Sequence, residues 1–117
     1  HLKETEGQVK RLEQVFQIVG ERPEGVECKA IQGIIEEGQE VLRAFQGGEA
    51  LDAGLIAAAQ AVEHYEITRY GSLIAWARQL GRNDCASLLQ KTLDEEKKTD
   101  AKLTSLAEGM VNMRAAG

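Results

Sequence analysis

The feature that most constrains the fold is a long run between Asp52 and Leu80 in which apolar residues recur at helical spacing. No proline interrupts this run, and Pro23 is the only proline in the chain. Asp52 can cap the N-terminus of a helix, and Gly81 occupies the position where a left-handed residue commonly ends one. The run therefore predicts a single long helix over residues 52–80.

Three other segments also show helical spacing of apolar residues. The first covers residues 1–19 and ends before Gly20. The second is shorter, covers residues 29–45 and ends before Gly47 and Gly48. Asn83 or Asp84 can cap a last helix through about residue 108, and we expect the small-residue tail 109–117 to fray. No alternating strand pattern is present, so the sequence predicts an all-α chain. Its length fits one domain over residues 1–117, a bundle with helix 29–45 in the crossover connection.

The overall charge and the cysteines limit the class of partner. The formal net charge is −5 and the basic residues form no block, so we expect neither nucleic acid nor an anionic membrane surface as a partner. The most apolar stretch, residues 55–62, is far shorter than the roughly 20 residues of a spanning helix. Cys28 and Cys85 are isolated, which predicts reduced thiols in a cytoplasmic protein.

Several carboxylates fall on apolar helix faces. On a wheel of about 100° per residue with Leu55 at zero, Glu66 lies near 20° and Glu63 near 80°. The stripe that the wheel predicts as the core contains Leu55, Ala59, Val62, Leu73, Ala77 and Leu80. In the last helix, Glu96 falls near the centre of the apolar face and Asp100 at its flank.

Inward carboxylates must be neutralised by protons, by cationic side chains or by a metal ion. A metal would neutralise all of them together, and hard oxygen ligands on facing helices suit iron or manganese. Two other readings stay open. Glu63 or Glu66 could pair with an arginine such as Arg69, and Glu96 could belong to a solvated acidic run with Asp94 and Glu95.

The first helix also carries polar residues on its apolar face. His1, Thr5 and Gln8 lie beside Leu12, and Glu4 lies at the flank. His1 and Glu4 are one turn apart and can reach a shared site. Their order is the reverse of the familiar Glu-x-x-His, so spacing alone assigns no ligand here.

Two segments carry a family resemblance: AAAQAVEHYEITRYGSL (57–73) and LLQKTLDEEKKTDAKLTSLA (88–107). Together with HLKETEGQVKRLEQVF at the start, they resemble the bacterial YciE/YciF ferritin-like stress-protein family. The resemblance implies a rubrerythrin-related ferritin-like four-helix bundle that is cytoplasmic, forms homodimers and binds a pair of iron or manganese ions, with no organic cofactor and no established reaction. It makes Glu63, Glu66, Glu96 and Glu4 the candidate metal ligands, with His1 and Asp100 next.

One departure from the family pattern affects this expectation. Family members normally begin with a further helix that carries a Tyr-x-x-Glu-like motif, and this sequence begins after it, so we expect an N-terminally truncated domain. That carboxylate could come from an upstream helix or a partner chain, or the site could be incomplete. The alternative function is a structural, self-associating helical module without a working metal site, in which an uncovered apolar groove drives dimerisation.

Overall fold

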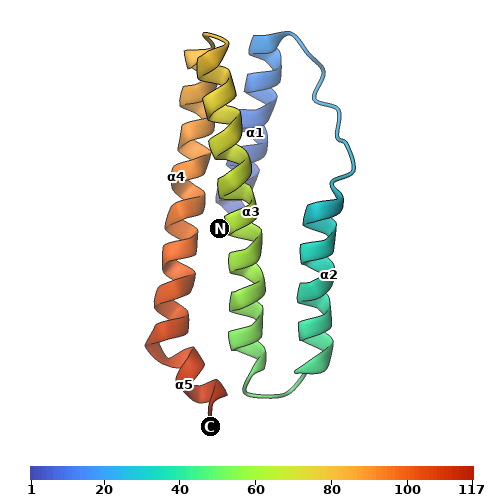
Figure 1. Cartoon of the computed structure of the whole chain (residues 1–117), viewed down its shortest axis with the longest axis vertical. Helices are drawn as coiled ribbons and strands as arrows, with labels where there is room; N and C mark the ends of the chain where they lie inside the picture. Colours follow the sequence, from blue (N-terminus) through green and yellow to red (C-terminus); the bar gives the residue numbers. More distant parts are fainter. The chain divides into compact units, whose positions relative to one another are not determined.

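The computed structural model describes all 117 residues and consists of helices without any strand (Figure 1). The helices are α1 (Leu2–Val19), α2 (Lys29–Ala44), α3 (Leu51–Gln79), α4 (Asn83–Leu106) and α5 (Asn112–Ala115), with a π-helical segment (Ala107–Val111) between the last two. The predicted all-α class is confirmed. None of these helices combines the length and the apolarity that crossing a membrane requires.

The helix ends agree with the predictions except at three places. One is the start of α4, which includes Asn83 and Asp84, so neither of these residues is its N-cap as predicted. Gly20 and Gly81 adopt positive φ angles of 75° and 71°, as glycines after a helix commonly do. Asp52 does not cap α3, because the helix begins at Leu51. Its carboxylate instead lies in the first turn, where its negative charge interacts favourably with the positive end of the helix dipole. The tail after residue 108 is also helical rather than frayed, since the π-helical segment leads directly into α5.

The chain divides into two compact units, which we describe separately. The first unit contains residues 1–27 and 66–97, and therefore α1 with the C-terminal part of α3 and the N-terminal part of α4. Its core is formed by Ile74, Ala86, Leu89 and Leu93, against which Leu12, Val15, Ile67, Tyr70 and Ala77 pack. This unit thus has a contiguous apolar core shared by three helical segments.

The second unit contains residues 28–65 and 98–117. Here α2 and the N-terminal part of α3 approach closely through small residues. A Cβ atom at Gly38 would lie 3.4 Å from the Cβ of Ala58, and one at Gly54 would lie 2.5 Å from Val41 Cγ1. No residue of α2 is fully buried, so this unit is held by close backbone approach rather than by a deep core.

The buried face of α3 is rotated from the predicted one. Ile74 and Glu63 are only 3% and 4% exposed, whereas Leu55, Leu73 and Leu80 of the predicted stripe are 37%, 39% and 77% exposed. The buried side lies about 80–100° from the predicted centre on the helical wheel. A long helix with a wide apolar arc does not reveal which part of that arc a neighbour covers. The prediction that these leucines form the core of α3 was wrong.

Candidate functional site

The site is centred on Glu96, whose side chain is completely buried. Cys85, Leu89, Thr92 and Glu96 recur every three or four residues along α4, so they lie on one helix face, and all four are buried. Burial of the apolar residues on this face turns it toward the core. Glu96 therefore enters a dry environment because of the helix that carries it, as its place in the sequence predicts.

Glu66 of α3 lies beside Glu96 in the first unit. Burial first, then a hydrogen bond with Glu96 and the charge of Glu96, together raise the pKa of Glu66 to about 8. Glu96 Oε2 is buried and receives no hydrogen bond from any donor group. Two carboxylates this close cannot both stay ionised without compensation. The pair can share a proton, or it can hold a cation.

Gln8 of α1 also forms a hydrogen bond with Glu96. Its side-chain Nε2 donates to Glu96 Oε1 and, at 3.3 Å, to Glu95 Oε1. Gln8 is itself only 6% exposed. The sequence places Gln8 on the apolar face of its helix, but the wheel could not identify its partner on α4.

Arg11, one turn after Gln8, holds the neighbouring carboxylate of Glu95. Arg11 Nη1 lies 2.5 Å from Glu95 Oε1, and Nη2 lies 2.8 Å from Oε2, which is a two-point pairing. The hydrogen bond from Arg11 lowers the pKa of Glu95 below its usual range. Glu95 is thus an ionised carboxylate with both oxygens paired. Glu96, the next residue, has one oxygen, Oε2, without a hydrogen-bond donor.

Tyr70 lies one turn after Glu66 on α3, and it is partly buried against the core. Burial and then the carboxylates of Glu66 and Glu96 raise its pKa to about 12. The phenol therefore keeps its proton at neutral pH. It is a neutral polar group next to the acidic pair.

His1 also belongs to the first unit. A ring nitrogen of His1 lies within 4.8 Å of a carboxylate oxygen of Glu96, and Nδ1 lies 3.3 Å from Glu4 Oε2. The side chains of His1 and Glu4 are 43% and 40% exposed, so these two residues lie toward solvent. The structure thus gathers four of the six predicted ligand residues in this unit: His1, Glu4, Glu66 and Glu96.

The other two predicted ligands belong to the second unit. Asp100 accepts a hydrogen bond from Gln60 at 3.2 Å and lies 3.1 Å from Nε2 of the exposed His64. Glu63 is 4% exposed and precedes Glu66 by one helical turn on α3. The helical wheel predicts that Glu66 is more deeply buried than Glu63, and the structure reverses that order, because the buried face of α3 is rotated.

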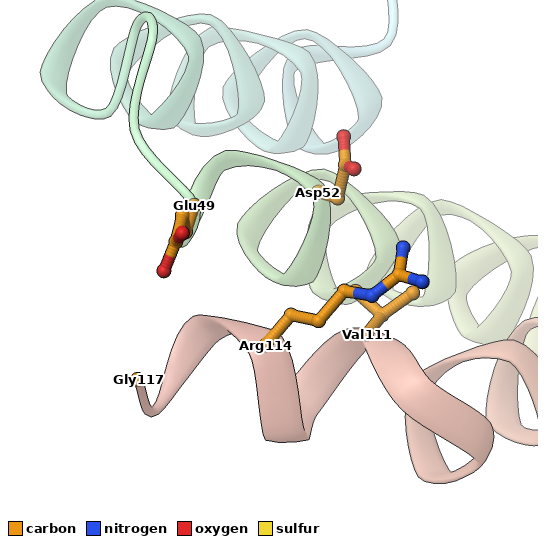
Figure 2. A pocket seen from close by; sticks show the side chains of 5 residues that line it. All are labelled: Glu49, Asp52, Val111, Arg114 and Gly117. Carbon is orange, nitrogen blue, oxygen red and sulfur yellow. The ribbon is translucent and has the colours of Figure 1, made fainter.

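The second unit also contains a surface hollow of about 370 Å³, lined by Glu49, Asp52, Val111, Arg114 and Gly117 (Figure 2). The three charged side chains are exposed, so water solvates them without any ligand. None of the predicted ligand residues lines this hollow. It gives no support for a second functional site.

Comparison with known proteins extends these observations. Residues 1–116 match a protein family described as a domain of unknown function, DUF892. The chain is 49% identical over 116 residues to Protein YciF of Escherichia coli strain K12, covering 98% of this chain and 70% of YciF.

Two solved structures are similar along most of the chain. The crystal structure of the E. coli stress protein YciF matches with a TM-score of 0.89 and 50% identity, covering 96% of this chain and 71% of that one. YcfI from Rhodopseudomonas palustris, to which a structural role has been ascribed, matches with a TM-score of 0.87 and 50% identity, covering 90% and 67%. These matches confirm the resemblance seen in the sequence, and they confirm the bundle fold.

Proposed function

The chain belongs to the DUF892 family and is a homologue of the stress protein YciF, and from this premise we propose that it is a metal-binding, ferritin-like protein of the bacterial stress response. In this proposal, carboxylates on facing helices hold one or two ions of iron or manganese. The proposal covers binding and assigns no reaction.

The observation that carries the proposal is the pairing of the partly buried Glu66 with the fully buried Glu96. An ionised carboxylate in an apolar environment is costly unless a partner compensates it. Arg11 is engaged by Glu95, and Gln8 serves only one oxygen of Glu96. Oxygen ligands that lack a donor suit a hard cation, so the residues present fit iron or manganese.

We propose a ligand set that follows from these positions. Glu66 and Glu96, which form the acidic pair, and His1, which has a ring nitrogen within 4.8 Å of a Glu96 oxygen, are the first candidates. Glu63 is a further candidate, because it is buried one turn before Glu66 on the same helix. Glu4 is a candidate through its contact with His1. Asp100 is the weakest, because Gln60 already donates to its carboxylate.

A bound iron or manganese ion would supply Lewis-acid or redox chemistry. The contribution of the chain is to hold the oxygens and to exclude water from them. Leu89 and Leu93, which are 4% and 7% exposed, lie on the same stretch of α4 as Glu96. Their burial keeps the carboxylate in a medium of low dielectric constant, where its attraction to a cation is strongest.

Titration calorimetry with Mn²⁺, and with Fe²⁺ under anaerobic conditions, tests the proposal. The wild-type protein should bind metal at a stoichiometry of one or more, and E96Q should lose this binding. D94N is the matched control, because it removes the same charge two residues away at an exposed position. Absence of stoichiometric binding by the wild-type protein, or equal binding by E96Q, would refute the proposal.

A structural, self-associating role is the second candidate, and the exposed apolar surface favours it. Trp76 and Leu80 are 59% and 77% exposed, and Val26 is 90% exposed. Apolar residues exposed in this number are commonly covered by a partner chain, here a second copy in a homodimer. Sedimentation equilibrium tests this role, and a stable monomer at micromolar concentration would contradict it.

A further inference from the structure

Glu95 and Glu96 are adjacent on α4 and chemically identical, yet only Glu95 is paired with an arginine. We propose that Gln8 and Arg11 are positioning residues that decide which of these two carboxylates binds metal. In this arrangement Arg11 withholds Glu95 from the ion, and Gln8 orients Glu96 toward it. The inference rests on the proposed metal-binding function and adds the residues that control the site.

Arg11 occupies Glu95 at both oxygens. The two guanidinium nitrogens lie 2.5 and 2.8 Å from the two carboxylate oxygens. A planar guanidinium pairs with a carboxylate in this way more strongly than a single ammonium group does. If Glu95 turned toward a metal ion, it would lose both bonds and leave Arg11 without its partner. Glu95 is therefore kept out of the ligand set.

Arg11 is itself fixed by a buried residue. Its Nη1 donates to Thr92 Oγ1 at 3.1 Å, and Thr92 is 1% exposed on the inward face of α4. Arg11 thus joins α1 to α4 at two residues that are nearly one helical turn apart. The guanidinium has little freedom to leave Glu95, since departure would also break the bond to Thr92.

Gln8 connects this fixed ion pair to Glu96. One amide nitrogen carries two hydrogens, and here its two acceptors are Oε1 of Glu95 and Oε1 of Glu96. The opposite amide orientation would bring the Gln8 oxygen against two carboxylates, so the network determines which end faces α4. One oxygen of Glu96 is held by an uncharged donor, and Oε2 is left for a cation.

The order of contacts is therefore Thr92, Arg11, Glu95, Gln8 and Glu96, all within the first unit. Each contact restricts the next, which is how an outer layer of hydrogen bonds usually orients the ligands of a metal site. Loss of Gln8 should let the carboxylate of Glu96 rotate. Loss of Arg11 should release Glu95 to compete for the ion and should remove the anchor of Gln8.

The test compares Q8M and R11K with the wild-type chain, with Mn²⁺ as the probe of affinity and Co²⁺ as the probe of coordination by visible absorption. We expect Q8M to bind Mn²⁺ roughly tenfold or more weakly, the usual effect of removing an orienting hydrogen bond. Its Co²⁺ spectrum should shift, because Glu96 changes its binding mode. Q14M is the matched control: Gln14 is exposed on the same helix, and the variant should behave as wild type.

R11K keeps the positive charge but cannot pair with both oxygens of Glu95 at once. The affinity of R11K for Mn²⁺ should fall between those of the wild-type chain and Q8M. If Q8M does not fold, R11K still tests the inference. The inference is overturned if Q8M or R11K lowers the melting temperature of the protein but leaves its Mn²⁺ affinity and Co²⁺ spectrum unchanged. If the wild-type chain binds neither ion, the proposed function fails, and this inference fails with it.

Discussion

The two units share helices α3 and α4 but differ in what those helices bury. Eight of the nine buried residues, all but Glu63, belong to the first unit. There α1 contributes Leu12 and Val15 to an apolar core. In the second unit α2 contributes glycine-mediated contacts and leaves Ile35 and Leu42 about half exposed. The comparison teaches that the dry, fixed environment that a carboxylate site requires exists where α1 packs.

Core truncation should separate the units most strongly. Leu89→Ala removes a side chain that is 4% exposed in the first unit, and we expect a loss of about 2–5 kcal/mol in the free energy of unfolding. The matched change Leu42→Ala, at a side chain that is 46% exposed in the second unit, should cost roughly 1 kcal/mol or less. Urea denaturation measures both, and equal losses would break the comparison.

Metal-dependent stabilisation should depend on the first unit. Mn²⁺ at about 100 times its dissociation constant should stabilise the wild-type protein by about 2.7 kcal/mol if it binds only the folded state. E96Q should show no such gain, because the ion loses the carboxylate whose Oε2 lacks a donor. Thermal unfolding with and without Mn²⁺ measures the difference. A full metal response in E96Q would place the ion elsewhere.

The ion pair between Arg11 and Glu95 should have a smaller effect on stability. Both side chains are 23% exposed, so solvent screens part of their attraction. Arg11→Met should cost about 1–2 kcal/mol, which includes the hydrogen bonds to Glu95 and Thr92. A double-mutant cycle with Glu95→Gln isolates the pair, and a coupling energy near zero would show that the pairing is incidental.

The pH dependence of the metal-free protein should report Glu66. Its pKa is raised from 4.5 to about 8, so the folded protein holds a proton that the unfolded chain releases. With respect to this group, stability is therefore greatest below about pH 4.5 and falls as the pH rises toward 8. E66Q should remove this part of the dependence when urea midpoints are compared in the presence of a chelator. An unchanged profile in E66Q would contradict the pairing of the partly buried Glu66 with Glu96.

Thiol reactivity gives the smallest and simplest contrast. Burial raises the pKa of Cys85, a 2% exposed residue of the first unit, so little reactive thiolate is present at neutral pH. Cys28, in the second unit, is partly exposed and contacts the Tyr65 hydroxyl at 3.0 Å. A thiol reagent should therefore label Cys28 first, as peptide mass spectrometry would detect. Earlier labelling of Cys85 would indicate that the first unit opens readily.

The fold was largely predictable because helical spacing and glycine stops are local signals. Gly20 and Gly81 end helices as predicted, since the φ angle they adopt depends on the residue itself. The starts of α3 and α4 and the continuation past residue 108 were missed. One residue decides whether Asp52 caps a helix or lies in its first turn, and neighbouring sequence does not specify that register.

The site was only partly predictable. The burial of Glu96 was expected, because it is surrounded by leucines on its own helix face. The roles of Gln8 and Arg11 were not, because each acts through a partner more than 80 positions away in the sequence. A wheel gives the direction of a side chain but not the residue that it meets. The sequence does contain one signal for Gln8: a side-chain amide at the centre of an apolar stripe requires a polar partner when it is buried.

The most direct test of the central claim is anomalous X-ray diffraction at the manganese absorption edge from crystals of this protein grown with Mn²⁺. The account predicts a manganese peak within coordination distance of Glu96 Oε2 and of the Glu66 carboxylate, with Glu95 still paired to Arg11. A peak only at other residues, or no peak at an Mn²⁺ concentration that saturates binding in solution, would contradict it.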